Sequence, residues 1–170
     1  MVRANFIGPD LTNGEKKQTA CVALYVGLHL DGFGFLLSDG QIIEAIECHH
    51  PSIVAIYAPL SLPKGLCRLE ESCPGQPLSP SKGRGCERDL SRHGTPCYYT
   101  IKRSIMKNVV YRAVTLKDEI TTGGCWVIEV YPYAAKVQLF GGHIPGKEMP
   151  AGIVSLRGRL AAILPGDVQP

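Results

Sequence analysis

The sequence has no apolar run long enough to cross a membrane, because no segment offers about 18 uninterrupted apolar residues. Its first residues carry one arginine and a short apolar run that ends at Gly8-Pro9-Asp10, without the long apolar core of a secretory signal. The chain also lacks an internal repeat, a low-complexity tract and a glycine-rich phosphate loop followed by lysine and serine or threonine. These absences predict a cytoplasmic protein with no membrane contact and no P-loop mechanism.

A strong excess of charge of one sign is also missing. The chain has 18 Lys and Arg residues against 15 Asp and Glu residues, which gives a net charge of +3 and a pI near 8.5. A net charge this small is compatible with nucleic-acid binding but does not indicate it. At 170 residues and 45% hydrophobic content, the chain is long enough for one domain with its own core and short for two. We therefore expect a single domain over residues 1–170.

Apolar segments alternate with turn residues in an order typical of a mixed sheet. Runs at 3–11, 20–28 and 29–39 are bounded by Gly, Asp or Asn, which favours three hairpin-linked antiparallel strands. The remaining predicted elements are a helix at 38–50, a buried strand at 52–57, a brief helix at 86–94, a helix at 100–120, a strand at 125–132 and helices at 134–141 and 152–164. This order predicts an α/β fold, with three antiparallel strands, then parallel strands, and helices on both faces.

The segment at about 64–97 is rich in Cys, Pro, Gly and Arg, has no apolar period and is predicted to be an irregular insertion. Structural zinc sites usually use close pairs such as Cys-x-x-Cys, whereas here five, 12 and ten residues separate successive cysteines. The spacing argues against zinc and leaves two disulfides or free thiols as the alternatives. The cysteines concerned are Cys67, Cys73, Cys86 and Cys97.

Two acidic residues stand at the ends of predicted strands. Asp10 follows Gly8-Pro9, where a carboxylate projects from a strand or serves as an ordinary turn residue. Glu129 lies inside the apolar strand "WVIEVY", so it either faces solvent or has a partner that offsets its desolvation. If the two strands are neighbours, the two carboxylates make an oxygen-rich site suited to Mg²⁺ or Mn²⁺.

Basic residues gather in and after the insertion, interleaved with Tyr98 and Tyr99. A mixture of this kind can bind phosphates and stack on bases, and it is also what an ordinary solvated surface looks like. The basic residues are Arg68, Lys82, Arg84, Arg88, Arg92, Lys102, Arg103 and Lys107.

Four motifs in this order resemble a known family. They are "GPDL" at 8–11, "VAIYAPLSLP" at 54–63, "GRGCERDLSRHG" at 83–94 and "VIEVYPYAA" at 127–135. Together they resemble the domain of unknown function 429 family, predicted nucleases of ribonuclease H-like fold. The resemblance covers about residues 6–164 and implies a ribonuclease H-like sheet of three antiparallel strands continued by parallel ones.

The resemblance also implies a site for metal-dependent phosphodiester hydrolysis, in which two divalent cations bind the scissile phosphate. It places Asp10 and Glu129 as ligands of Mg²⁺ or Mn²⁺. It further implies that three arginines orient phosphate oxygens. These arginines are Arg84, Arg88 and Arg92.

The chain departs from the family at Tyr57, where relatives read "IDAPL" and this chain reads "IYAPL". A neutral phenol is a poor ligand for a hard divalent cation, so the expected central carboxylate is missing. Glu44 on the predicted first helix is a candidate substitute. The sequence therefore leaves three functions open: a metal-dependent nuclease, a non-catalytic domain that binds nucleic acid or another partner, and a domain that handles a phosphorylated small molecule.

Overall fold

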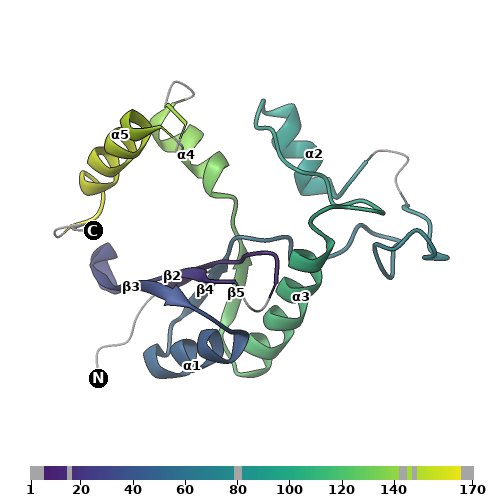
Figure 1. Ribbon diagram of the computed structural model, residues 1–170, viewed down its shortest axis with the longest axis horizontal. Coiled ribbons are helices and arrows are strands. Elements are labelled where there is room, and N and C mark those ends of the chain that lie inside the picture. The colour runs from purple at the N-terminus through teal and green to yellow at the C-terminus, as the bar shows by residue number, and fades with distance from the viewer. Residues whose placement is uncertain (1–5, 15–16, 79–81, 142–144, 147–148, 166–170) are drawn as a thin grey trace.

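The computed structural model describes residues 6–14, 17–78, 82–141, 145–146 and 149–165. These residues form one five-stranded sheet in the order β3-β2-β1-β4-β5 (Figure 1). β1 pairs antiparallel with β2, and β2 with β3, whereas β4 runs parallel to both β1 and β5. The prediction of three antiparallel strands followed by parallel ones is confirmed. The strands are β1 (Phe6–Asp10), β2 (Thr19–Leu24), β3 (Leu30–Leu36), β4 (Ile53–Ile56) and β5 (Trp126–Glu129).

Helices α1 (Asp39–His49) and α3 (Lys107–Thr122) lie together on one face of the sheet (Figure 1). α1 begins where the Ser38 hydroxyl accepts a hydrogen bond from the backbone N–H of Gln41, which is a standard helix cap. The buried side chains of both helices share one cluster with those of β1 and β4. This cluster is the main core, and its helical members are Ile42, Ile46, Val109, Ala113, Leu116 and Ile120.

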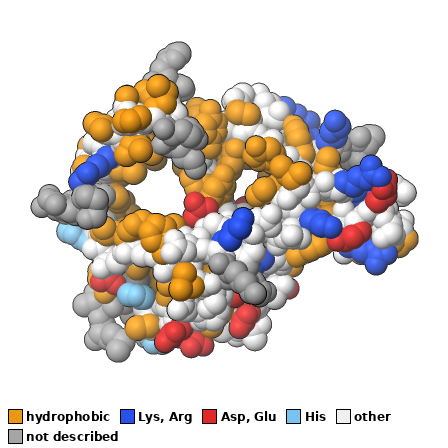
Figure 2. Space-filling model, in the orientation of Figure 1, with side chains coloured by type: hydrophobic (Ala, Val, Ile, Leu, Met, Phe, Trp, Pro, Cys, Tyr) orange, Lys and Arg blue, Asp and Glu red, His pale blue; other side chains and the backbone are white. Residues whose placement is uncertain are grey.

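The opposite face of the sheet stays exposed. Phe33 on β3 and Trp126 on β5 expose 67% and 76% of their surface there, and Phe35 and Ile128 are exposed as well. Figure 1 shows α4 (Pro132–Phe140) and α5 (Pro150–Ala161) on this side, and Figure 2 shows open space between them and the sheet. Helices packed on both faces were predicted. Among the described residues, packing into the core is confirmed for one face only.

The helix predicted at 100–120 begins later, at Lys107. The apolar spacing of Ile101 and Ile105 suggested a longer helix, but Ile105 is 75% exposed. Arg103 has a positive φ of 62° and its N–H donates to the carbonyl of Leu69, while Lys102 donates to the carbonyl of Cys73. The Arg103 N–H is thus used by the insertion rather than by a helical turn, and the Lys102 side chain adds a second contact, so tertiary structure overrides the local pattern here.

The insertion carries α2 (Gly85–Arg92), which projects beyond the end of the sheet in Figure 1. A short 3-10 helix, η1 (Val26–Leu28), joins β2 to β3. No helix in the described part of the chain is both long and apolar enough to span a membrane.

Candidate functional site

Three predicted site positions meet at one edge of the sheet. Asp10 ends β1, Tyr57 follows the last residue of β4, and Glu129 ends β5. These strands are neighbours, and the Tyr57 N–H donates to the carbonyl of Pro9 at 3.1 Å, so the ladder continues to the strand ends. The carboxyl ends of parallel strands are a common place for a binding site, because loops diverge there and leave an open crevice.

The strand register nevertheless separates the two predicted metal ligands. Ile7 and Val54 are register partners and both point into the core. Since side chains alternate along a strand, Asp10 and Tyr57, each three positions later, point to the opposite, open face. Glu129 is in register with Ile56, the buried last residue of β4. The Glu129 side chain therefore leaves its strand on the core face. Asp10 and Glu129 leave the sheet in opposite directions.

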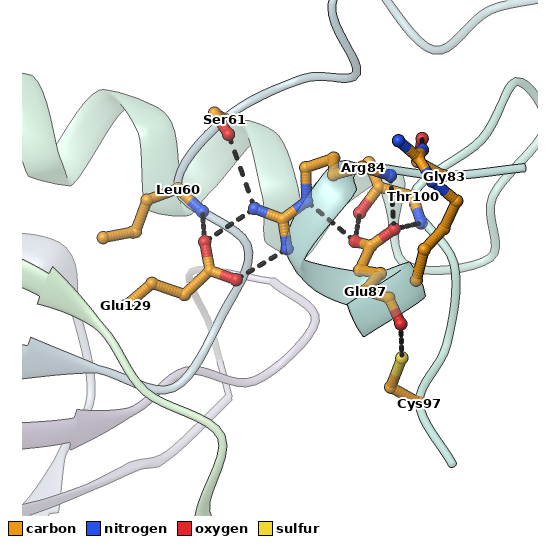
Figure 3. A network of polar contacts seen from close by, with 9 residues as sticks. Leu60, Ser61, Gly83, Arg84, Glu87, Cys97, Thr100 and Glu129 are labelled. Carbon is orange, nitrogen blue, oxygen red and sulfur yellow. Dashed lines mark hydrogen bonds and ion pairs between the residues drawn. The ribbon is translucent and has the colours of Figure 1, made fainter. Parts of the chain in front are cut away.

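Glu129 forms a two-point ion pair with Arg84 (Figure 3). Both distances, Nη1 to Oε2 and Nη2 to Oε1, are 2.6 Å. The backbone N–H of Leu60 also donates to Oε2 at 2.9 Å. This planar fork is the strongest common arrangement of arginine and carboxylate, and it uses both oxygens of Glu129.

Arg84 continues the network to a second carboxylate, Glu87 on α2 (Figure 3). Its Nε lies 2.7 Å from Glu87 Oε1. Thr100 donates to the same carboxylate through its N–H at 2.9 Å and its hydroxyl at 2.5 Å, and the backbone N–H of Arg84 donates as well. Burial raises the pKa of Glu87, but the hydrogen bonds from Thr100 and Arg84 lower it by more, so the net shift is downward.

Burial alone lowers the pKa of Arg84, and its bonds to Glu129 and Glu87 raise it well above its ordinary value. Arg84 is therefore a permanent cation between two carboxylates. The network ties the insertion to the end of β5.

The other two predicted phosphate-binding arginines also lie on α2. Arg88 donates through Nη1 to the carbonyl of Gly83 at 3.0 Å, and exposed Arg92 pairs with exposed Asp89 at 2.7 Å. Both lie near Arg84 in the chain but outside the ion-pair network with Glu129. Glu44 is exposed on α1 and is not among the residues that line the cavity described next.

A cavity of about 130 Å³ lies beside the network and is lined mostly by apolar and aromatic groups. Arg84, Glu87 and Glu129 form its polar wall, and Tyr57, Tyr98 and Tyr131 contribute aromatic rings. Its remaining lining residues are Leu11, Ala58, Pro59, Leu90, Cys97, Thr100, Met106 and Val130. Its lining of apolar groups with a few convergent polar groups resembles that of ligand sites, but its volume is below the range of about 300–1,000 Å³ that is usual for them, so it has room for a small group only.

Tyrosine rings form a row beside this cavity, and three of them, Tyr57, Tyr98 and Tyr131, line it. The ring centroids of Tyr57 and Tyr131 are 5.9 Å apart, and those of Tyr131 and Tyr133 are 6.2 Å apart. Tyr98 stands nearby, exposes 73% of its surface and lines a hollow with Tyr131 and Tyr133. Lys136 Nζ lies 4.7 Å from the Tyr133 ring centroid, a cation–π distance. We call Tyr57, Tyr98, Tyr131 and Tyr133 the tyrosine row.

The phenols of Tyr57 and Tyr131 are neutral at physiological pH. Burial raises the pKa of Tyr57, and the nearby charge of Asp10 raises it further. Burial also raises the pKa of Tyr131 to about 12, and its hydroxyl donates to the carbonyl of Pro96 at 2.7 Å. These rings therefore offer flat apolar faces with polar rims rather than anionic ligands.

This donor set does not fit the divalent metal that the family resemblance implies. Both oxygens of Glu129 are held by Arg84, a cation that a metal would have to displace, and the strand register starts Asp10 and Glu129 on opposite faces of the sheet. In the described ranges, no three His, Cys, Asp or Glu side chains are grouped so that they could hold a metal ion. The site is built around an internal cation instead.

Sequence reasoning found Asp10, Tyr57 and Glu129 but missed Glu87, Thr100 and the tyrosines that follow β5. The one local signal for Glu87 is its spacing of three from Arg84 at the start of a helix, which places its carboxylate near that backbone N–H. Nothing in the sequence linked Thr100 to α2. Comparison of the chain with models of protein families, with curated proteins and with solved structures finds no match in any of the three.

Proposed function

We propose that this chain is a non-catalytic nucleic-acid-binding domain of ribonuclease H-like fold, which takes unpaired bases on its tyrosine row. The observation that carries the proposal is the row itself, with neighbouring ring centroids 5.9 and 6.2 Å apart at the carboxyl edge of the sheet. Stacking of bases on aromatic rings is the common way in which proteins hold single strands without reading sequence. Duplex bases are already stacked, which makes the single strand the expected ligand.

Positive charge beside the row supports the same function. A surface hollow of about 340 Å³ adjoins Tyr98 and Tyr99 and is lined by Lys82 and Arg103. Lys82 is exposed and is placed to contact a phosphate backbone whose bases stack on the row. Arg103 is also exposed, but it forms an ion pair with Glu71 and would exchange that partner for a phosphate. The sheet order and the four sequence motifs support a ribonuclease H-like fold for the domain.

The Arg84–Glu129 pair argues against hydrolysis at this edge. Two-metal hydrolysis needs carboxylates that share cations, and here one carboxylate is neutralised by arginine and another is replaced by Tyr57. A carboxylate that is already neutralised by a two-point ion pair with arginine offers little negative charge to a divalent cation. We therefore expect this edge of the sheet to bind nucleic acid without cleaving it.

The binding proposal is tested by fluorescence anisotropy with labelled single strands about 12 nucleotides long, of DNA and of RNA, and with their duplexes. Tyr98→Ala is the first variant, because Tyr98 is highly exposed and its loss leaves the core intact. We expect the parent to prefer single strands and Tyr98→Ala to bind about tenfold more weakly. The affinity of the parent should fall steeply with salt.

Phe33→Ala is the matched control, since Phe33 is an exposed ring of similar size on the open sheet face. It should bind like the parent. If Phe33→Ala weakens binding and Tyr98→Ala does not, the sheet face is the binding surface and the tyrosine row is not. No binding of any strand at low salt would remove the function altogether.

A second candidate, descent from or retention of a metal-dependent nuclease, is favoured by the position of Asp10 beside Tyr57. The charge of Asp10 raises the pKa of Tyr57, so the two side chains are close on one face. A carboxylate at position 57 would stand next to Asp10 and complete a two-carboxylate donor set. Tyr57→Asp should therefore acquire Mn²⁺ binding, measured by calorimetry, that the parent lacks. Cleavage of the labelled strands by the parent would instead support the nuclease.

A further inference from the structure

Two thiols lie in contact in the insertion. The Sγ atoms of Cys67 and Cys73 are 3.2 Å apart and share a hydrogen bond in which either sulfur can donate. Cys67 is exposed, whereas Cys73 is buried. Closing this distance to a sulfur–sulfur bond requires a movement of about 1 Å.

The loop around these thiols is held in place by contacts on both sides. Leu66, Leu69 and Cys73 are buried in a cluster with Val110 of α3. The N–H of Leu78 donates to the carbonyl of Lys64 at 2.9 Å and closes the base of the loop. The loop therefore positions the two sulfurs before any reaction takes place.

Further contacts fix Cys73 itself. Lys102 Nζ donates to the Cys73 carbonyl at 2.7 Å, and the N–H of Cys73 donates to the carbonyl of Glu70 at 3.0 Å. The segments around Gly65 and Gly75 approach so closely that a Cβ placed on Gly75 would collide with the Gly65 carbonyl. Only glycine therefore fits at position 75. Cys73 has little freedom to move away from Cys67.

The thiol of Cys73 differs from the other half-buried or buried thiols of the chain. Burial raises its pKa, but hydrogen bonds from the Cys67 thiol and from backbone N–H groups lower it by more, to about 7. Burial raises the pKa of Cys21 to about 11, and burial with the charge of Glu87 raises the pKa of Cys97. Thiolate is the reactive form of cysteine, so the lowered pKa favours reaction at Cys73 over reaction at Cys21 or Cys97.

We propose that Cys67 and Cys73 form a thiol–disulfide modification site, which small disulfides of the glutathione class oxidise reversibly. In the reactive form the two sulfurs share one proton. When this proton lies on Cys73, the exposed Cys67 thiolate attacks one sulfur of the small disulfide, which leaves a mixed disulfide and releases one small thiolate. Cys73 then gives the proton to that released thiolate, and the Cys73 thiolate attacks the Cys67 sulfur, which releases the second small thiolate. The protein loses two electrons and the small disulfide gains them as one thiol and one thiolate.

Oxidation would close a ring from Cys67 to Cys73 that contains Leu69, whose carbonyl accepts from the Arg103 N–H at 2.8 Å. Segment 100–103 is attached to this loop at Lys102 and Arg103 and to Glu87 at Thr100. The modification site and the ion-pair network therefore share one short segment.

The test uses the full chain, equilibrated with mixtures of reduced and oxidised glutathione, quenched with acid, alkylated and cut with trypsin. Trypsin cleaves after Arg68, between the two cysteines, so the disulfide is seen as peptide 65–68 linked to peptide 69–82. We expect this link at a smaller fraction of oxidised glutathione than any adduct on Cys48, which is an exposed thiol on α1. Glutathione adducts on Cys67 and Cys48 in parallel, or a link from Cys67 to Cys86, would overturn the proposal.

Two variants identify the order of attack. Cys73→Ala should hold glutathione on Cys67 as a lasting adduct, because the second thiol is gone. Cys67→Ser should slow the alkylation of Cys73 at neutral pH and move the midpoint of its pH profile above about 7. Cys48→Ser is the matched control and should change neither readout. Rapid loss of the adduct from Cys73→Ala, or an unchanged pH profile in Cys67→Ser, would contradict the mechanism.

Discussion

Arg112 and Arg84 are both 8% exposed and both form ion pairs, but their surroundings differ. Arg112, on α3, pairs with Asp39 at the start of α1 at 2.6 Å. Its other donors reach the carbonyls of Thr12 and Gly14 and the hydroxyl of Thr19. Arg112 therefore joins α3, α1 and the connection between β1 and β2, and all but one of its partners are uncharged.

Arg84 has two carboxylates as partners, lines a cavity, and is held from the insertion rather than from the core. Glu129, the partner that it reaches across the cavity wall, keeps 32% of its side chain exposed. Arg112 therefore stabilises the fold, whereas Arg84 shapes a site. Because Arg84 lines a cavity, an incoming anion can replace one of its carboxylate partners. Arg112 is not among the residues that line this cavity.

The largest expected effect is that of Arg112→Ala on stability. Each buried side-chain nitrogen and oxygen of the described residues has a partner, so this change leaves several acceptors without a donor. We expect a loss of about 3 kcal/mol in the free energy of unfolding, measured by urea denaturation. Arg112→Lys should recover only part of it, because lysine lacks the planar fork. A loss no larger than that of Arg84→Ala would show that Arg112 does not stabilise the fold more than Arg84 does.

Arg84→Ala should cost less, about 2 kcal/mol in the same measurement. Glu87 keeps its bonds from Thr100 and from the backbone of residue 84, and Glu129 can turn to solvent. The diagnostic difference is in metal binding, because Arg84→Ala removes the cation beside Glu129 and leaves only the Leu60 N–H bonded to its carboxylate. Calorimetry should show weak Mn²⁺ uptake by Arg84→Ala and none by Arg112→Ala; equal uptake by both variants would contradict the role assigned to Arg84.

The loss of folding stability at low pH is expected to depend on the carboxylate of Glu87. Its folded-state pKa lies below its ordinary value of 4.5, because bonds from Thr100 and Arg84 outweigh the effect of burial. Such a group contributes stability fully above the unfolded pKa and loses it as the pH falls through the folded pKa. Urea midpoints of the parent should therefore decline below about pH 4.5, and Glu87→Gln should flatten that decline. An unchanged slope in Glu87→Gln would mean that another carboxylate is responsible.

Arg92→Ala should have the smallest effect. Its pair with Asp89 is exposed on both sides, at 73% and 62%, so solvent screens it. We expect urea midpoints and strand affinity equal to those of the parent within error. A tenfold loss of strand affinity would show that Arg92 contacts phosphate, as the family resemblance implies, and would extend the binding surface along α2.

Much of the fold could be predicted from local patterns. The strands and α1 have apolar spacing and turn residues that agree with their final environment, and sheet order follows from hairpins and crossovers. The start of α3 could not be predicted, because Arg103 and Lys102 bond to the insertion rather than to a helical turn. The open sheet face could not be predicted either, since Trp126 lies on β5, a parallel strand, and parallel strands are usually covered on both faces.

The site was only partly predictable for a similar reason. Strand ends identify Asp10, Tyr57 and Glu129, because the carboxyl edge of a sheet is a property of strand order. The partner of Glu129 lies 45 positions away in a segment without periodicity, so no local rule connects it to Arg84. Contacts of that range depend on how the insertion folds as a whole.

The central claim is that this sheet edge binds single strands without cutting them. One measurement tests it directly: a labelled single strand is incubated with excess protein and Mn²⁺, bound fraction is read by anisotropy, and strand length is read on a denaturing gel. The account predicts bound, full-length strand with the parent and with Glu129→Gln alike. Shortened strand with the parent, and full-length strand with Glu129→Gln, would contradict it.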